Sequence, residues 1–289
     1  MMKKLLFIML VCAVATSAWA AEIQWFGGAH DRDWFNAANW NSNLIPPGPV
    51  PTANDKAKLN YVWANPGPII SAPGAVAGEI FISEDRDLGT VGEQSLTVAT
   101  GGVLNTGGGI GYAGQVILGY YGADDRIPLP ANEGRLIMAG GTATIGPAGG
   151  GGGHLFVGFS GIGHLEVDAG LLTVTNMFGL GWNGGSGTVD ISGGELNTEA
   201  WNFSNASSYS FNFSALRTAL GDGEWVQNHY WQVEIQALVD AGKITTTVPG
   251  AHVQVDWDPV LQQTHVYAIP EPVSIVMLGL GALLLRKRS

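Results

Sequence analysis

The chain has 289 residues, enough for one large domain or two small ones with a sizeable buried core. Its 43 glycines are about twice the average usage, and charged residues make up only 13% of the chain, which argues against disorder caused by charge. Acidic residues outnumber Lys and Arg by 24 to 13. This balance argues against nucleic acid or an anionic membrane surface as a partner.

Residues 1–20 have the three parts of a secretory signal peptide. Two lysines precede an apolar run, and Ala18 and Ala20 supply the small-x-small cleavage pattern, so we expect signal peptidase to leave Ala21 as the first residue. The one cysteine of the sequence, Cys12, lies within this segment. We therefore expect an exported mature chain that folds without a disulfide.

Residues 21–94 are expected to form an N-terminal β cap, and they open with "WFGGAHDRDWFNAANW". This opening resembles the W-x-G…D-W…N-W start of exported bacterial β-solenoids, which implies a structural role. The matching residues are Trp25, Gly27, Asp33, Trp34, Asn39 and Trp40. We expect the three tryptophans in the core of the cap, and the alternative is that they stack on sugar rings.

The same opening holds four oxygen donors, Asp31, Asp33, Asn36 and Asn39. Calcium prefers several such ligands, but the spacing is not that of an EF-hand and no glutamate completes the set. Asp and Asn also bond to their own backbone in turns. We therefore predict a structural turn and no metal site, with calcium binding as the alternative.

Residues 95–204 contain a repeat punctuated by glycine. Four segments, "LTVATGGVLNT", "LIMAGGTATIG", "LEVDAGLLTVT" and "VDISGGELNT", start apolar-x-apolar, then reach a glycine and a further apolar residue. Alternation at period 2 predicts strands, and the glycine predicts a turn or bend between them. The equivalent positions are Leu96, Leu136, Leu165 and Val189 at the start, Gly101, Gly141, Gly170 and Gly194 at the turn, and Val103, Ala143, Leu172 and Leu196 beyond it.

A second pattern lies between these units. "VILGYYG", "LFVGFSG" and "FGLGWNG" share an apolar-Gly-aromatic-x-Gly arrangement. Short strands that recur every 20 to 40 residues are typical of a β-solenoid, in which stacked coils bury a continuous apolar interior. The predicted fold is therefore all-β, a parallel β-helix, and the alternative is an antiparallel sandwich of hairpins.

Residues 205–268 are expected to close the repeat as a C-terminal cap. "HYWQVEIQALVDAGKI" has apolar residues at helical spacing, which predicts a short capping helix over Tyr230 to Ala241 with Gly242 after its end. "HVQVDW" and "THVYAI" predict two closing strands on either side of Asp258 and Pro259.

Acidic residues in neighbouring repeats are the candidates for catalysis, because cleavage of a polysaccharide needs two or three converging acids. Glu166 and Asp190 directly follow interior positions, so we expect them side by side and pointing outward, where acids usually keep a strand soluble. The full set is Glu166, Asp168, Asp190 and Glu195. Neither "GIGYAG" nor "GLGWNG" is followed by a helix-forming stretch, as a dinucleotide site requires. We therefore assign no catalytic residue and no cofactor.

The last segment, residues 269–289, combines a rigid tripeptide with an apolar run and a basic end. Pro270-Glu271-Pro272 precedes a run of thirteen residues, Val273 to Leu285, that are all apolar or glycine except Ser274. As a transmembrane helix this run spans about 20 Å of a roughly 30 Å hydrocarbon layer, so it is a short stop-transfer helix with its positive end on the cytoplasmic side. The basic residues are Arg286, Lys287 and Arg288.

This tail resembles the PEP-CTERM sorting signal of Gram-negative bacteria. The resemblance implies recognition by an exosortase-type membrane enzyme, a transient stay in the inner membrane, and release or attachment at the cell surface or in the extracellular matrix, often among exopolysaccharide. It covers only the tail. We therefore expect a non-enzymatic surface or matrix protein, and the alternative is a polysaccharide-active enzyme or carbohydrate-binding module on a β-helix scaffold.

Overall fold

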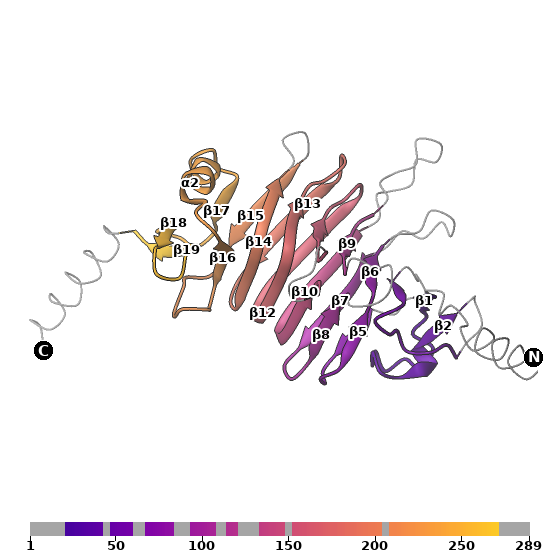
Figure 1. Ribbon diagram of the computed structural model, residues 1–289. Coiled ribbons are helices and arrows are strands. Elements are labelled where there is room, and N and C mark those ends of the chain that lie inside the picture. The colour runs from indigo at the N-terminus through magenta and orange to yellow at the C-terminus, as the bar shows by residue number, and fades with distance from the viewer. Residues whose placement is uncertain are drawn as a thin grey trace, which may run out of the picture.

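The computed structural model describes residues 21–42, 47–59, 67–83, 93–107, 114–120, 133–147, 152–203 and 208–271. Over these ranges the protein is mostly β, with a large mixed and largely parallel sheet and one short α-helix. The strands lie side by side along an elongated body (Figure 1). The predominance of parallel pairing contradicts the alternative of an antiparallel sandwich.

A first series of parallel pairings contains the predicted repeat. Leu136 pairs with both Leu96 and Leu165, and Leu165 also pairs with Val189. All four side chains are buried, so the predicted equivalence of these positions is confirmed. The strands of this series are β4 (Ile69–Ile70), β7 (Glu93–Ala99), β10 (Glu133–Ile145), β12 (Ile162–Leu180), β13 (Ser186–Ile191), β15 (Tyr209–Phe213) and β17 (Ile244–Thr246).

A second series corrects the predicted alignment by one residue. Ala143 pairs with Leu104 rather than with Val103, and Leu104 is the buried one of the two. The reason is a difference in turn length. Three residues separate Ala99 from Val103, whereas only two separate their pairing partners in the next repeat, Ala139 and Thr142. The strands are β5 (Ala75–Ala77), β8 (Val103–Thr106), the later parts of β10 and β12, β14 (Glu195–Phe203) and β16 (Glu224–Asn228).

The turn glycines follow the prediction with one exception. Gly101, Gly170 and Gly194 have positive φ angles of 84°, 90° and 66°, which L side chains adopt only with strain. In the second repeat the residue with positive φ is Gly140, at 102°, and not the predicted Gly141. The bulge at Ala139 and Gly140 accounts for this shift.

A third series of parallel pairings joins the segments that share the apolar-Gly-aromatic pattern. Leu155 pairs with Val116 on one side and Phe178 on the other, which confirms the predicted alignment. The aromatic rings that follow form a cluster, with Tyr120 and Phe159 stacked at 5.3 Å. The strands are β1 (Glu22–Trp25), β3 (Lys56–Leu59), β6 (Glu79–Ile82), β9 (Val116–Leu118), β11 (Leu155–Val157) and the last parts of β12 and β14.

The N-terminal end of the body is closed by three buried tryptophans. The Trp40 ring lies 5.1 Å from Trp25 and 4.7 Å from Trp34, in edge-to-face contact with both. Strand β2 (Trp40–Ser42) follows the short 3₁₀-helix η1 (Ala37–Asn39) and pairs antiparallel with β1. The tryptophans are at most 1% exposed, so the core assignment is confirmed and the sugar-stacking alternative is contradicted.

The C-terminal end carries the helix and an antiparallel hairpin. Helix α2 (Gln232–Asp240) lies within the predicted range, is followed by Gly242 at φ 67°, and buries Ile235. The hairpin consists of β18 (Ala251–Asp258) and β19 (Gln263–Pro270), and β19 also pairs antiparallel with β16. Among the residues that the structure describes, no helix is long and apolar enough to cross a membrane. The predicted helix at 273–285 lies outside those residues.

Candidate functional site

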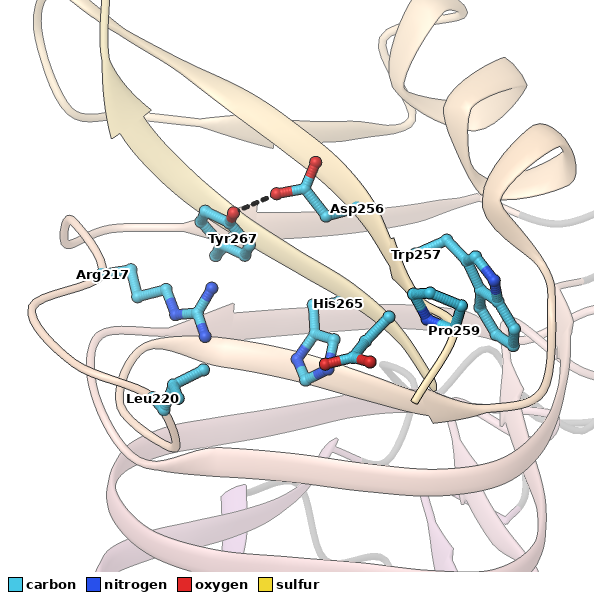
Figure 2. Close-up of a pocket in the computed structure, with 8 residues that line it drawn as sticks. Arg217, Leu220, Asp256, Trp257, Pro259, His265 and Tyr267 are labelled. Atoms are coloured by element: carbon cyan, nitrogen blue, oxygen red, sulfur yellow. Dashed lines mark hydrogen bonds between the residues drawn. The ribbon is translucent and has the colours of Figure 1, made fainter. Parts of the chain in front are cut away.

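An open pocket of about 420 Å³ lies against the C-terminal hairpin. It is formed by β18, β19 and the connection between β15 and β16, which contributes Arg217 and Leu220. Figure 2 shows His265 of β19 between Arg217 on one side and Pro259 on the other. The volume of the pocket falls within the range that is typical of small-molecule binding sites.

The hairpin register explains why polar side chains gather in this pocket. Asp256 pairs with His265, whereas Val255 pairs with Val266, and both valines are buried. Because successive residues of a strand point to opposite faces, the face opposite the valines carries polar groups. The pocket therefore receives Asp256 and Asp258 from β18 and His265 and Tyr267 from β19.

Glu224, at the start of β16, is the buried charge behind the pocket, with 1% of its surface exposed. Its Oε2 lies 2.9 Å from Arg217 Nη2 and 3.3 Å from His265 Nδ1. Its Oε1 accepts a hydrogen bond of 2.5 Å from the Gly221 backbone N–H. Burial raises the pKa of Glu224, but the bonds from His265 and Gly221 and the charge of Arg217 outweigh it, so the pKa lies below its ordinary value.

Arg217 is held from several directions. Its guanidinium lies 4.1 Å from the centre of the Tyr267 ring, and its Nε donates to the Ala219 carbonyl at 3.3 Å. The Tyr267 hydroxyl in turn donates to Asp256 Oδ2. Burial, followed by the hydrogen bond to Asp256 and its charge, raises the pKa of Tyr267. These contacts fix one wall of the pocket.

Asp258 and His265 have groups left over for a ligand. Asp258 Oδ1 accepts the N–H groups of Val260 and Leu261 in the hairpin turn, which lowers the pKa of this aspartate. Neither the second Asp258 oxygen nor His265 Nε2 has a hydrogen-bond partner among residues in the described ranges. The pocket can therefore bind a ligand through a carboxylate oxygen and an imidazole nitrogen.

The predicted sorting residues lie only partly within the described chain. Pro270 is the last residue of β19, where it pairs with Ala251. Glu271 is exposed, and its backbone N–H donates to the Gly250 carbonyl at 2.8 Å. The backbone N–H of Lys56 donates a hydrogen bond to the carbonyl of Ala21. The remaining predicted residues, Ala18, Ala20, Pro272, Arg286, Lys287 and Arg288, lie outside the described ranges.

The four candidate acids lie on the repeat and not in the pocket. Glu166 pairs with Asp190 in register, and both are partly exposed. The prediction that these two acids lie side by side is therefore confirmed. Glu166 lies 3.4 Å from Arg135, and Asp190 accepts a bond of 3.3 Å from Asn212. The other two acids also have neighbours: Asp168 accepts from Ser192 at 2.7 Å, and Glu195 accepts from Asn197 at 3.2 Å. Each acid therefore already has a partner on the protein.

A row of polar side chains that the sequence analysis missed crosses the same strands. His164 Nε2 lies 2.5 Å from Glu133 Oε1, and His164 Nδ1 contacts the Thr188 hydroxyl. His164 directly precedes Leu165 and Thr188 directly precedes Val189, so the repeat alignment contained the signal for this pair. The row lies on the outer face of the strands, because His164 and Thr188 directly precede the buried Leu165 and Val189 and successive residues of a strand point to opposite faces.

The oxygen donors near the N-terminus form a turn, as predicted. Asp31 accepts hydrogen bonds from Asn36, Asn39 and the Asp33 backbone, at 2.5 to 3.0 Å. Asn39 Oδ1 accepts from the Ala29 N–H at 2.8 Å. The bond from Asn39, followed by those from Asp33 and Asn36, lowers the pKa of Asp31. These oxygens bond to their own segment.

Gly179 to Gly184, one of the two G-x-G-x-x-G matches, begins with the last two residues of β12 and continues into the connection to β13. The element that follows is a strand, not the helix that a dinucleotide site requires. Gly179 instead makes room for a neighbouring side chain, because a Cβ there would lie 2.7 Å from the Phe156 ring. The other match falls mostly outside the described residues, which include only Gly114 from it.

The pocket was not predicted from the sequence. The alternation in "HVQVDW" and "THVYAI" is the signal that places Asp256, His265 and Tyr267 on one face. Arg217 and Glu224 belong to no repeat, so no pattern pointed to them. A search of protein-family models, curated proteins and solved structures finds no match to this chain.

Proposed function

We propose that this protein is an exported, non-enzymatic component of the cell surface or extracellular matrix, with a β-solenoid body and a C-terminal PEP-CTERM sorting signal. Strand β12 supports the solenoid part, because its successive thirds take part in all three parallel series. A chain that visits three faces in turn and returns one strand further along is a coil of a solenoid.

The observation that carries the sorting part is the place of Glu271. Glu271 is the last residue that the structure describes; its backbone N–H bonds to the hairpin through the Gly250 carbonyl, and its side chain is exposed. The carboxylate is therefore presented at the edge of the folded body and next to two prolines whose φ angles are fixed. An exosortase-type enzyme in the inner membrane would find this motif preorganised, at little cost in ordering entropy.

A fractionation experiment in the native host tests the proposal. We expect Glu271→Ala to leave the signal peptide cleaved but the tail attached, with the protein retained in the inner membrane. The matched control is Glu234→Ala, which removes an exposed glutamate on α2 and should reach the surface normally. Normal tail loss and surface arrival of the Glu271→Ala chain would refute the sorting signal.

The pocket at the hairpin favours a second candidate function, a carbohydrate-binding module on the same scaffold. Its open shape, free carboxylate oxygen and free imidazole nitrogen suit the hydroxyl groups of a sugar. Binding of exopolysaccharide would account for retention in a matrix.

A further inference from the structure

The charge of the hairpin pocket is not balanced. The one arginine that lines it, Arg217, is already paired with the buried carboxylate of Glu224. Asp256 and Asp258 line the same pocket, and over the described ranges neither forms an ion pair with a lysine or arginine. The ligand-facing surface is therefore negative at neutral pH, which disfavours acidic sugars and favours a cation.

The two aspartates are placed to act together. They are two residues apart on β18 and so point to the same side of the strand. The protein holds both carboxylates, because Asp256 accepts from Tyr267 at Oδ2 and from Gln254 at Oδ1, and Asp258 accepts from the hairpin turn at Oδ1. The carboxylates are held in position before any ligand arrives, which lowers the entropy lost on binding.

Uncharged groups complete the surface. Pro259 and the largely exposed Leu220, at 80%, give apolar flanks, and His265 Nε2 offers a hydrogen bond. An ammonium group carried on a ring of hydroxyls matches this combination of carboxylates, imidazole and apolar flanks. We propose that the pocket binds a sugar residue that carries a free amino group. This inference rests on the proposed association with exopolysaccharide and names the sugar class.

The test compares two oligosaccharides that differ in the amino group. The full chain, purified in mild detergent, is titrated calorimetrically with glucosamine hexamer and with its N-acetylated counterpart at 0.15 M salt. We expect binding to the free amine to be about tenfold tighter, because acetylation removes the charge that the carboxylates recognise. Polygalacturonate hexamer and a lysine hexamer are titrated in the same way, and each should bind more weakly than glucosamine hexamer.

Isosteric variants separate the pocket from the general acidity of the protein. Asp256→Asn and Asp258→Asn keep the acceptors for Tyr267 and the turn, and each should weaken glucosamine binding about threefold, with about tenfold for the pair. The matched control is Asp240→Asn at the exposed end of α2, which changes the net charge equally and should leave binding unchanged. Thermal melts of all four variants verify folding.

Several outcomes would overturn the proposal. These are absence of binding to glucosamine hexamer, equal binding of the acetylated or acidic hexamer, tighter binding of the lysine hexamer, or equal weakening by Asp240→Asn. Failure here is distinct from failure of the sorting proposal, because the Asp256→Asn and Asp258→Asn double variant should still reach the cell surface in the fractionation experiment.

Discussion

The Arg217 guanidinium lies 2.9 Å from a carboxylate, that of Glu224, whose side chain is only 2% exposed. Removing one partner of a buried pair leaves a charge without compensation, so Arg217→Ala should lower the free energy of unfolding by about 3 kcal/mol in urea denaturation. The control is Arg135→Ala, whose partner Glu166 is more exposed, and it should cost about 1 kcal/mol or less. Equal losses in the two variants would contradict the role of burial.

The same glutamate makes the protein sensitive to acid. Since the pKa of Glu224 is lowered from its ordinary value of 4.5, its stabilising contribution is fully present above that value. The contribution is lost as the pH falls through the lowered pKa of the folded state. Urea unfolding between pH 7 and pH 3 should therefore show a smaller loss in Glu224→Gln than in the parent chain. An identical acid slope in both proteins would count against this assignment.

Replacing a turn glycine by alanine should destabilise the protein by an amount that depends on what surrounds the glycine. Gly170 has φ 90°, and a Cβ there would lie 2.1 Å from the Gly141 carbonyl oxygen, so Gly170→Ala should destabilise by about 2 to 4 kcal/mol. Gly184 has φ 85° with nothing within 4 Å, so Gly184→Ala should cost only the conformational term of about 1 to 2 kcal/mol. Thermal melts that rank the two variants in the opposite order would refute the close approach at Gly170.

Strand register gives a third pair of variants. Leu104 is 1% exposed and pairs with Ala143, whereas Val103 is only partly buried. Leu104→Ala should lower the free energy of unfolding by about 2 to 5 kcal/mol, and Val103→Ala should lower it by less than about 1 kcal/mol. A larger loss for Val103→Ala would restore the alignment predicted from the sequence.

Chelators should have little effect on the N-terminal turn. Asp31 accepts its hydrogen bonds from Asn36, Asn39 and the Asp33 backbone, so the turn holds itself together. We expect EDTA to leave the melting temperature unchanged and Asp31→Ala to lower it. A clear rise of the melting temperature on addition of calcium would point to a cation at these oxygens.

The repeat was predictable because its units align with one another. Leu96, Leu136 and Leu165 occupy equivalent places in three segments, and a stacked parallel register is the arrangement that buries all of them. The error at Val103 arose because one extra residue in a turn shifts the register without changing the hydrophobic pattern.

The pocket could be predicted only in part. Alternation along the hairpin places Asp256, His265 and Tyr267 on one face, which is local information. Arg217 lies in the connection between β15 and β16 and Glu224 is the first residue of β16, and neither belongs to the repeat seen in the sequence. The contact between Glu224 and His265 joins residues 41 positions apart, and only the folded chain brings them together.

The antiparallel strands at the two ends give the body a defined length. Strand β2 pairs with the side of β1 that faces away from β3 and so ends the third series, and β19 pairs with the side of β16 that faces away from β14 and so ends the second series. Each further strand within one of these series adds about 4.8 Å to the separation of the ends. Losing or gaining one repeat should therefore change the length of the body by one such step and leave the hairpin pocket intact.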